Sequence, residues 1–445
     1  MELKDLLITP IYLLFIFVVA YLLRNRYSTP ATRKYFMPAL TLKIVGAIAL
    51  GFVYQFYYGW GDTFTYFHVG SRYVWEAFLD SPLLAFKLIF AGAEYEPDTF
   101  YYASRIYTYG DLPSYFVVRL AGFFDILTFH TYSATAVLFA VVSFTGIWAL
   151  YSSLARLFPE LTKPFALAVL FMPSVFFWGS GLLKDSITLG AVGWLVYAVV
   201  QLFFMKKKHP GLVVLALISL YILYIVKIYI LLCIMPGIII WLFQSFVKRI
   251  KSSIVRVVIG PVVFGVALAA GFYAIVSIGQ SNAKYSFEQL AYTAEETARW
   301  LNYVGEVQGG SVYDLGDFDY TPAGMLRKFP LAVWVTLYRP YPWEAYNPVM
   351  MLSALESAFM FFLTLLVFVK CGVVNVFRYI LSNPFVLFCM VFAISFSFAV
   401  GISTYNFGSL VRYKIPMVPF YLSAMFIIRH YAKSPKKVGA LAITE

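Results

Sequence analysis

Charged residues are scarce in this chain. Asp, Glu, Lys and Arg make up 13% of its 445 residues, about half the share of a typical soluble protein, and hydrophobic residues make up 61%. A soluble domain could not cover that much apolar surface. Several continuous apolar runs reach the roughly 20 residues with which a helix crosses the hydrocarbon core of a bilayer. The composition therefore predicts a membrane protein built of helices, with the lipid bilayer as a partner.

Cysteine and histidine are rare too, with three and four residues in the whole chain. The sequence holds no CxxC and no HExxH, so we expect neither a disulfide framework nor a zinc site, and we assign no metal ligands. The net charge of +12 does not indicate nucleic-acid binding, because no basic stripe with a reading motif accompanies it. Basic loops that orient a membrane protein explain the charge better.

Eleven apolar runs predict about eleven transmembrane helices in an all-α integral membrane protein. They lie at about 8–23, 38–57, 131–155, 164–180, 186–205, 211–226, 228–247, 254–279, 349–369, 384–402 and 413–428. We expect one polytopic membrane domain over 1–437 with two long outer loops, at about 58–130 and 280–348, and a short cytoplasmic tail, 438–445. The apolar stretches 82–92 and 114–129 suit interfacial or re-entrant helices better than spans.

Positive and negative charges fall in alternate loops. One set of loops holds 19 of the 34 basic residues, and 19 of the 22 acids lie on the other side of the predicted spans. By the positive-inside rule the basic side is cytoplasmic. We therefore expect the N-terminus outside and the C-terminus in the cytoplasm of a bacterial cell, with the chain in the inner membrane.

Four polar motifs fall on the predicted outer side. The first is Gly59-Trp60-Gly61-Asp62-Thr63, where the glycines allow a tight turn at the end of a span. This turn presents Asp62 at the membrane surface. Two interpretations stay open: Asp62 caps the next helix, or it is a general base, an electrostatic anchor or a metal ligand at the mouth of a cavity.

The second motif runs from Pro173 through Trp178 to Lys184 and Asp185, where two predicted spans meet with almost no loop. Proline and glycine break the helices there and free backbone groups. Either Lys184 snorkels and Asp185 caps a helix, or Lys184 contacts a phosphate together with amides at the start of the next helix. Lys227, between two apolar runs, is interpreted as marking a tight outer hairpin.

The third motif, Tyr338-Arg339-Pro340-Tyr341-Pro342-Trp343-Glu344, enters the span that contains Glu356. Arg339 suits bidentate phosphate binding. Trp343 either stacks on a sugar or anchors the chain at the interface. Glu356 should face the interior of a helix bundle and have a partner there.

The fourth motif extends from Asn406 to Arg412, Tyr413 and Lys414, between the last two predicted spans. Arg412 and Lys414 are cations on the side where topology does not favour positive charge. Their position favours anion binding.

With these motifs the chain resembles bacterial multi-spanning GT-C glycosyltransferases and the related polysaccharide polymerases, including uncharacterised membrane proteins of the Bacteroidetes type. The matching residues are Gly61-Asp62-Thr63, Trp178 with Lys184-Asp185, Arg339 to Glu344, and Asn406 with Arg412-Tyr413-Lys414. The resemblance covers about 55–420. The chain departs from the family in carrying a single Asp, Asp62, in its first outer-loop motif instead of paired acids, in having an extra preceding span, and in lacking a large C-terminal soluble domain in this sequence.

The resemblance implies a GT-C-like fold and a sugar donor linked to a polyprenyl phosphate or diphosphate. It makes Asp62 the candidate base, and Asp185 and Glu344 join it as candidate catalytic acids. The candidate substrate-binding residues are Lys184, Arg339, Arg412, Lys414, Trp343, Asn406, Trp178 and Glu356. It leaves a divalent cation open as a cofactor, and no organic cofactor is expected.

The expected function is transfer of a sugar or oligosaccharide from a polyprenyl-linked donor to a glycan or lipid acceptor outside the cytoplasm, in cell-envelope glycan synthesis. Two alternatives remain. A transporter or flippase of a lipid-linked or anionic solute would place its polar residues near the midplane and need gates on both sides. A non-catalytic scaffold of an envelope assembly would not bring the four motifs together.

Overall fold

The computed structural model describes residues 2–249, 290–307 and 312–433. Within these ranges the chain is helical and forms no strand, with a single isolated antiparallel bridge between Val312 and Asn406. The chain divides into two compact units, unit 1 over Met1–Ile228 and unit 2 over Tyr229–Glu445. Each unit is described separately, and the single membrane domain expected from the sequence stays a prediction.

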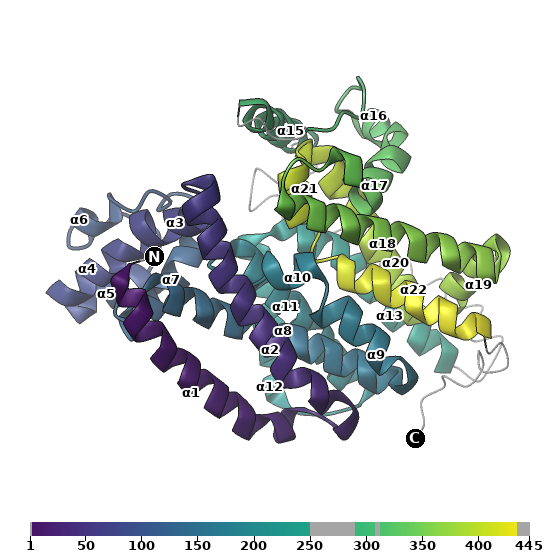
Figure 1. The fold of residues 1–445 in the computed structure, drawn as a ribbon, viewed down its shortest axis with the longest axis horizontal. Helices are drawn as coiled ribbons and strands as arrows, with labels where there is room; N and C mark the ends of the chain where they lie inside the picture. The colour runs from purple at the N-terminus through teal and green to yellow at the C-terminus, as the bar shows by residue number, and fades with distance from the viewer. Residues whose placement is uncertain (1, 250–289, 308–311, 434–445) are drawn as a thin grey trace. The chain divides into compact units, whose positions relative to one another are not determined.

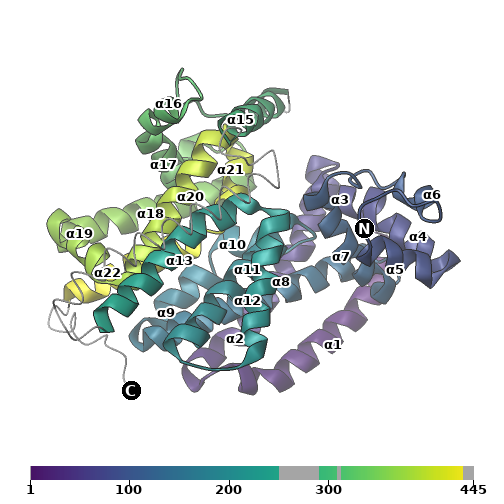
Figure 2. The same cartoon turned by 180° about the vertical axis from the view of Figure 1, so that it is seen from behind.

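Unit 1 contains the helices drawn from purple to teal in Figure 1. They are α1 (Leu3–Tyr27), α2 (Pro30–Val53, continued by a π-helical turn Tyr54–Tyr58), α3 (Asp62–Tyr66), α4 (Arg72–Asp80), α5 (Pro82–Phe90), α6 (Phe100–Ala103), α7 (Leu112–Thr128), α8 (Tyr132–Leu157), α9 (Thr162–Phe165), α10 (Pro173–Phe177), α11 (Lys184–Val199, continued by a π-helical turn Val200–Phe204) and α12 (Pro210–Val226). Figure 2 shows α12 beside α11.

Unit 2 contains nearly all of α13 (Ile228–Arg249) and the helices drawn in green and yellow. They are α15 (Leu290–Val307), α16 (Pro322–Arg327), α17 (Phe329–Tyr338), α18 (Pro348–Cys371), α19 (Val373–Ser382), α20 (Pro384–Thr404), α21 (Phe407–Tyr413) and α22 (Val418–Lys433). A capping residue followed by proline begins several of them. Asn347 accepts a hydrogen bond from Met350 N at the start of α18, and Asn383 caps α20 in the same way. Local sequence thus sets these boundaries.

Seven described helices are long and apolar enough to cross a membrane. They are Leu3–Tyr27, Pro30–Tyr58, Tyr132–Leu157, Lys184–Phe204, Ile228–Val247, Pro348–Cys371 and Pro384–Thr404. The pair Phe407–Tyr413 and Val418–Ala432, bent by 67°, would be an eighth as one broken span. The chain is therefore a multi-pass α-helical membrane protein.

The other predicted spans differ from a single long helix or lie outside the described residues. The predicted span 211–226 forms α12, which has 17 residues. The predicted span 164–180 is divided among α9, a π-helical turn and α10, because the chain leaves the helix at Phe171 and Pro173 starts a new one. The predicted span 254–279 and the tail 438–445 lie outside the described residues. The total of eleven spans stays a prediction.

Helix α8 lies at the centre of unit 1 between α2 and α11 (Figure 1). Against α2, the ring of Phe36 packs edge-to-face on Phe144 and Trp148, with centroids 5.2 and 4.7 Å apart. Further along, Ala47 packs with Ala136 and Ala140. Because rising residue numbers in α2 meet falling ones in α8, the two helices are antiparallel.

Charge is segregated along the helices of unit 1. The indole of Trp148 donates to Tyr27 O (2.8 Å), which joins the C-terminal parts of α1 and α8. The loops at that end carry Arg24, Arg26, Arg33, Lys34, Arg156, Lys163 and Lys206 to Lys208, with Glu160 as the one acid. The opposite end carries the other acids of the unit, among them Asp62, Asp111 and Asp185. We call it the acidic end.

Glycines set the distance between α8 and α11. A Cβ on Gly146 would lie 2.1 Å from Gly190 O, and a Cβ on Gly193 would lie 2.1 Å from Gly146 O. The backbones approach too closely for any side chain at these positions, as in many helix pairs of membrane proteins.

Replacing Gly146 with alanine should therefore destabilise unit 1 by about 1–3 kcal/mol, because the added methyl group forces the two helices apart. The measurement is the thermal unfolding midpoint in detergent. Gly110→Ala is the matched control, since a Cβ there has no heavy atom within 4 Å. Equal midpoints for the two variants would contradict this description of the α8–α11 contact.

Candidate functional site

The turn before α3 presents Asp62. Gly59 and Gly61 both have positive φ values, 75° and 154°. A Cβ on Gly61 would lie 2.2 Å from the ring of Tyr54, so the position also requires glycine for space. The side chain of Asp62 is exposed, whereas the next residue, Thr63, is buried and its hydroxyl lies 2.8 Å from that of Tyr132. The buried Thr63 thus holds the turn in place, and the turn presents the exposed carboxylate of Asp62.

The second motif comes together with the first at the acidic end of unit 1. Lys184, the first residue of α11, lies 3.4 Å from the carboxylate of Asp111, the N-cap of α7. The negative charge of Asp62 also acts on the Lys184 ammonium. The structure therefore pairs Lys184 with Asp111, which the motif search did not single out, and the charge of Asp62 acts on the same lysine.

Asp111 stays ionised over a wide pH range. Burial alone would raise its pKa, but hydrogen bonds from Ser114 and the charge of Lys184 outweigh burial and lower the pKa below its ordinary value. A carboxylate thus faces the Lys184 ammonium at neutral pH. An anionic ligand that reaches Lys184 has to share the lysine with this carboxylate.

A buried ion pair lies next to Lys184. The Lys227 ammonium donates to Asp185 Oδ1 at 2.5 Å, and both side chains are nearly inaccessible to solvent. The sequence interpretation of Lys227 as a simple hairpin marker missed this partner, which is 42 residues away in the chain. The pair ties the end of α12 to the start of α11, which fixes the position of Lys184. The catalytic role expected for Asp185 stays a prediction.

Lys43, in the middle of α2, is a second residue that the sequence analysis missed. Its ammonium is buried and donates to Ser143 Oγ (3.2 Å), Val175 O (3.2 Å) and Gly179 O (2.6 Å). Two of these acceptors are backbone carbonyls that the break around α10 leaves without helical partners. Lys43 thus stabilises the irregular segment that contains Trp178, which is itself buried.

In unit 2 the third motif forms a charged clamp. Arg339 binds both carboxylate oxygens of Glu344, with Nε 3.1 Å from Oε2, and Tyr341 N donates to the same Oε2 at 2.8 Å. Trp343 is 78% exposed, and its ring stacks on Tyr341 with centroids 4.9 Å apart. An accessible aromatic surface therefore lies beside a guanidinium group that a carboxylate already holds in place.

The fourth motif meets the third through Lys414. The buried ammonium of Lys414 donates to Ser357 Oγ (2.8 Å) and Arg339 O (3.2 Å), and the charge of buried Glu356 acts on it. Glu356 therefore faces the bundle interior and has a charged neighbour, as the sequence predicts. Lys414 holds the chain at Arg339, and its expected phosphate contact stays a prediction.

Arg412 and Asn406 occupy the two ends of α21. Asn406 caps the helix by accepting from Ser409 N (3.1 Å), and its backbone pairs with Val312. Arg412 is half-buried, and its guanidinium lies over the ring of Tyr413. The third and fourth motifs thus form one cluster in unit 2, as the first and second do in unit 1.

His68, on the π-helical turn Phe67–Ser71, packs among the rings of Trp60, Phe64 and Phe67. Burial lowers its pKa, and the nearby charges of His130 and Arg72 lower it further. The folded protein therefore favours the neutral imidazole.

This lowered pKa predicts a pH dependence of stability. The neutral form contributes its full stability above about pH 6.5, the ordinary histidine pKa. That contribution is lost as the pH falls through the folded-state pKa, because protonation then favours the unfolded chain. The unfolding midpoint in detergent should fall between pH 7.5 and 5, with a smaller slope in His68→Gln. His209→Gln, at an exposed residue, is the control, and the same slope in both variants would refute the assignment.

Comparisons with known proteins do not place the chain in a family. No known protein family, no curated protein and no solved structure matches it significantly. The geometry of the two clusters is therefore the main support for any functional conclusion.

Proposed function

We propose that the chain is a membrane glycosyltransferase or oligosaccharide polymerase. Its donor is a sugar on a polyprenyl phosphate or diphosphate, and its acceptor is a glycan or a lipid. The observation that carries the proposal is the pair of Lys184 and Asp111 at the acidic end of unit 1, where the charge of the exposed Asp62 also acts on Lys184. An exposed acid and a cation at the end of membrane helices suit a reaction between a hydroxyl group and a lipid phosphate.

The proposal includes a topology and a fold. We propose a GT-C-like arrangement of eleven spans in the bacterial inner membrane, with the N-terminus outside and the C-terminus in the cytoplasm. The charge segregation along the helices of unit 1 supports it, because the end that carries Arg24, Arg33 and Lys206 would then be cytoplasmic. The acidic end faces outward, where lipid-linked sugars for envelope glycans are used.

The cluster of unit 1 supplies the reacting groups. Asp62 orients or deprotonates the acceptor hydroxyl, and Lys184 stabilises the leaving phosphate, on which negative charge develops. In the cluster of unit 2, Arg339 and Arg412 are proposed contacts for lipid phosphate. Trp343 offers its exposed ring to a sugar face. The lipid tail of the donor stays in the bilayer, so the donor reaches the site without leaving the membrane.

A transfer assay tests this function. The full-length protein is reconstituted in vesicles with a panel of radiolabelled sugars on polyprenyl phosphate and diphosphate, plus glycan and lipid acceptors. We expect label in the acceptor with at least one donor, and a raised donor KM in Lys184→Met. Lys87→Met is the matched control, since Lys87 pairs with the exposed acids Glu96 and Asp98 of the following loop. Absence of transfer with every donor, together with no binding of polyprenyl phosphate, would overturn the proposal.

Lys43 favours one alternative, a transporter of an anionic or lipid-linked solute. A buried cation halfway along a membrane helix is a common feature of transport pathways. A counterflow experiment with labelled polyprenyl phosphate in the same vesicles distinguishes the two functions. Exchange across the membrane that Lys43→Met abolishes would favour transport over transfer.

A further inference from the structure

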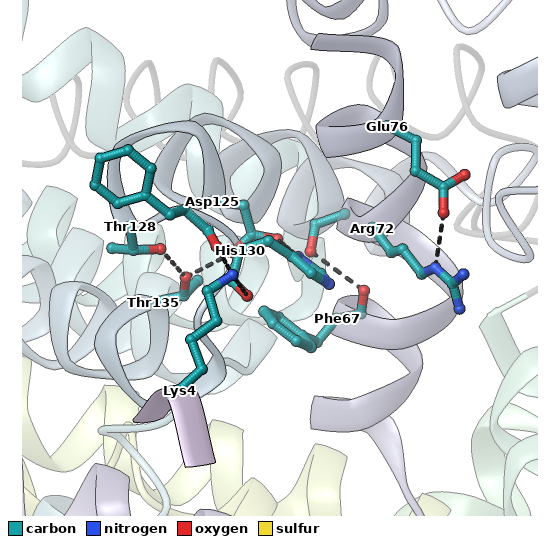
Figure 3. Close-up of polar contacts among 10 residues, drawn as sticks. Lys4, Phe67, Arg72, Glu76, Asp125, Thr128, His130 and Thr135 are labelled. Carbon is teal, nitrogen blue, oxygen red and sulfur yellow. Dashed lines mark hydrogen bonds and ion pairs between the residues drawn. The ribbon is translucent and has the colours of Figure 1, made fainter. Parts of the chain in front are cut away.

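Asp125 and His130 form a hydrogen-bonded pair between α7 and α8 (Figure 3). His130 Nδ1 lies 2.9 Å from Asp125 Oδ2, and Thr135 Oγ1 donates to Asp125 Oδ1 at 2.6 Å. The carboxylate is fully buried, whereas the imidazole is 18% exposed. Because an ionised carboxylate only accepts hydrogen bonds, it places the imidazole proton on Nδ1. The other nitrogen, Nε2, is then a proton acceptor, and it has no hydrogen-bond partner among the described residues.

The backbone holds His130 in an unusual conformation. Phe129 and His130 both lie in the left-handed region, with φ values of 55° and 51°. Residues other than glycine rarely adopt this conformation, and backbone strain of this kind is concentrated at functional sites. Lys4 stabilises the turn by donating to the carbonyl oxygens of Phe129 and His130. The left-handed backbone and the hydrogen bonds from Lys4 together orient the imidazole ring of His130.

Phe67 packs against one face of the His130 imidazole ring. Its phenyl group stacks on the His130 imidazole with centroids 4.2 Å apart and an angle of 2° (Figure 3). Thr135, which anchors Asp125, is itself 2.8 Å from the hydroxyl of Thr128. The imidazole is therefore held on one face and at Nδ1, as a general base must be to keep its second nitrogen in position.

The pair lies beside the Asp62 turn. Tyr132, two residues after His130, touches Thr63, the residue after Asp62, through their hydroxyl groups. A row of rings leads from His130 through Phe67 and His68 to Trp60. The segment that contains Asp62 and the turn that contains His130 therefore pack against each other at the acidic end of unit 1.

We propose that His130, oriented by Asp125, is the general base of the transferase reaction, and that Asp62 orients the acceptor hydroxyl. This inference rests on the proposed function and assigns its proton transfer to one residue. His130 Nε2 takes the hydroxyl proton while the acceptor oxygen forms a bond to the anomeric carbon. The bond from that carbon to the donor phosphate breaks, and the phosphate leaves with the electron pair. The imidazolium then returns its proton to solvent or to the phosphate.

Several charged or titratable groups lie around the turn that holds His130. They are Asp125 of α7, Lys4 and Asp5 of α1, His68 of the neighbouring turn, and Arg72 of α4, whose charge acts on His68. Asp5 reaches the same turn by accepting from Ser133 N at 2.7 Å. The buried carboxylate of Asp125 is the one of these groups that directly bonds the ring.

The pH–rate profile of the reconstituted full-length enzyme tests the inference. The rate should fall on the acid side as an imidazole protonates, and His130→Gln should lower kcat by about 10²- to 10⁴-fold with little change in KM. Asp125→Asn should also lower kcat and shift the acid limb, because asparagine does not hold the same tautomer. His430→Gln, in α22 of unit 2, is the control and should retain the wild-type profile.

A second readout needs no variant and no turnover. Diethyl pyrocarbonate modifies neutral imidazoles, and His130 should react and be protected by polyprenyl phosphate.

If His130→Gln keeps the wild-type rate and acid limb while transfer is present, the inference fails and the proposed function stands. If the vesicles transfer no sugar and polyprenyl phosphate gives no protection, both fail. Protection of His130 without transfer would overturn its role as the base, and would leave His130 as part of a lipid-phosphate binding site.

Discussion

Replacing Lys227 with methionine is expected to lower the free energy of unfolding by about 3–5 kcal/mol, because it removes the ammonium that pairs with the buried carboxylate of Asp185. The pair joins α12 to α11 inside unit 1 with a 2.5 Å contact. The thermal unfolding midpoint of the purified protein in detergent measures the loss. Lys87→Met, which removes the same charge from an exposed position of α5, should leave the midpoint unchanged.

The double variant Asp185→Asn with Lys227→Met separates charge from packing. It removes both buried charges, so it should recover much of the stability that either single variant loses. If the single variant Lys227→Met is as stable as the wild type, the buried pair described between α11 and α12 does not exist. Additive losses in the double variant would show that packing, and not charge, makes the contact.

If the proposed transfer is correct, replacing Asp62 with asparagine is expected to reduce its rate by about 10²- to 10³-fold, because the acceptor hydroxyl then loses its charged partner in the transition state. Stability should hardly change, since the Asp62 side chain is exposed. The measurement is kcat for label transfer in reconstituted vesicles.

Glu94→Gln is the matched control for Asp62→Asn. Glu94 is an exposed acid of the same segment between α2 and α8, so its loss changes the local net charge by the same amount. We expect the wild-type rate from it. Equal rates in the two variants would mean that Asp62 contributes only negative charge to the acidic end, with no specific contact to the acceptor hydroxyl.

The sequence predicted the membrane class and seven helices that the structure describes as candidate spans, because a long apolar run is a local property. It also predicted a break between Pro173 and Lys184, where proline and glycine cannot continue a helix. These features depend on residues that are close together in the chain. The segment 164–180 was predicted less well, because its apolar residues continue on both sides of Pro173, and hydropathy alone does not reveal that the chain leaves the helix at Phe171 and starts a new one.

Partners between distant segments could not be predicted. Lys43 stands in an apolar run whose pattern gives no sign that its ammonium meets Val175 O and Gly179 O. The Asp125–His130 pair escaped for a different reason: a lone histidine beside an acid five residues away is common in proteins. The left-handed turn at Phe129 and His130 brings the imidazole back onto the Asp125 carboxylate. The sequence does not predict this turn, because neither glycine nor asparagine occupies it.

The central claim is that a lipid phosphate binds at the acidic end of unit 1, and photo-crosslinking tests it most directly. The probe is a polyprenyl phosphate with a diazirine near its phosphate, added to vesicles that contain the full-length protein. We predict adducts within 59–68, 111–114 and 129–132 and at Lys184, which excess unlabelled polyprenyl phosphate removes and Lys184→Met weakens. Adducts confined to exposed apolar residues of α1, such as Leu14 and Phe15, and unaffected by competitor or variant, would contradict the claim.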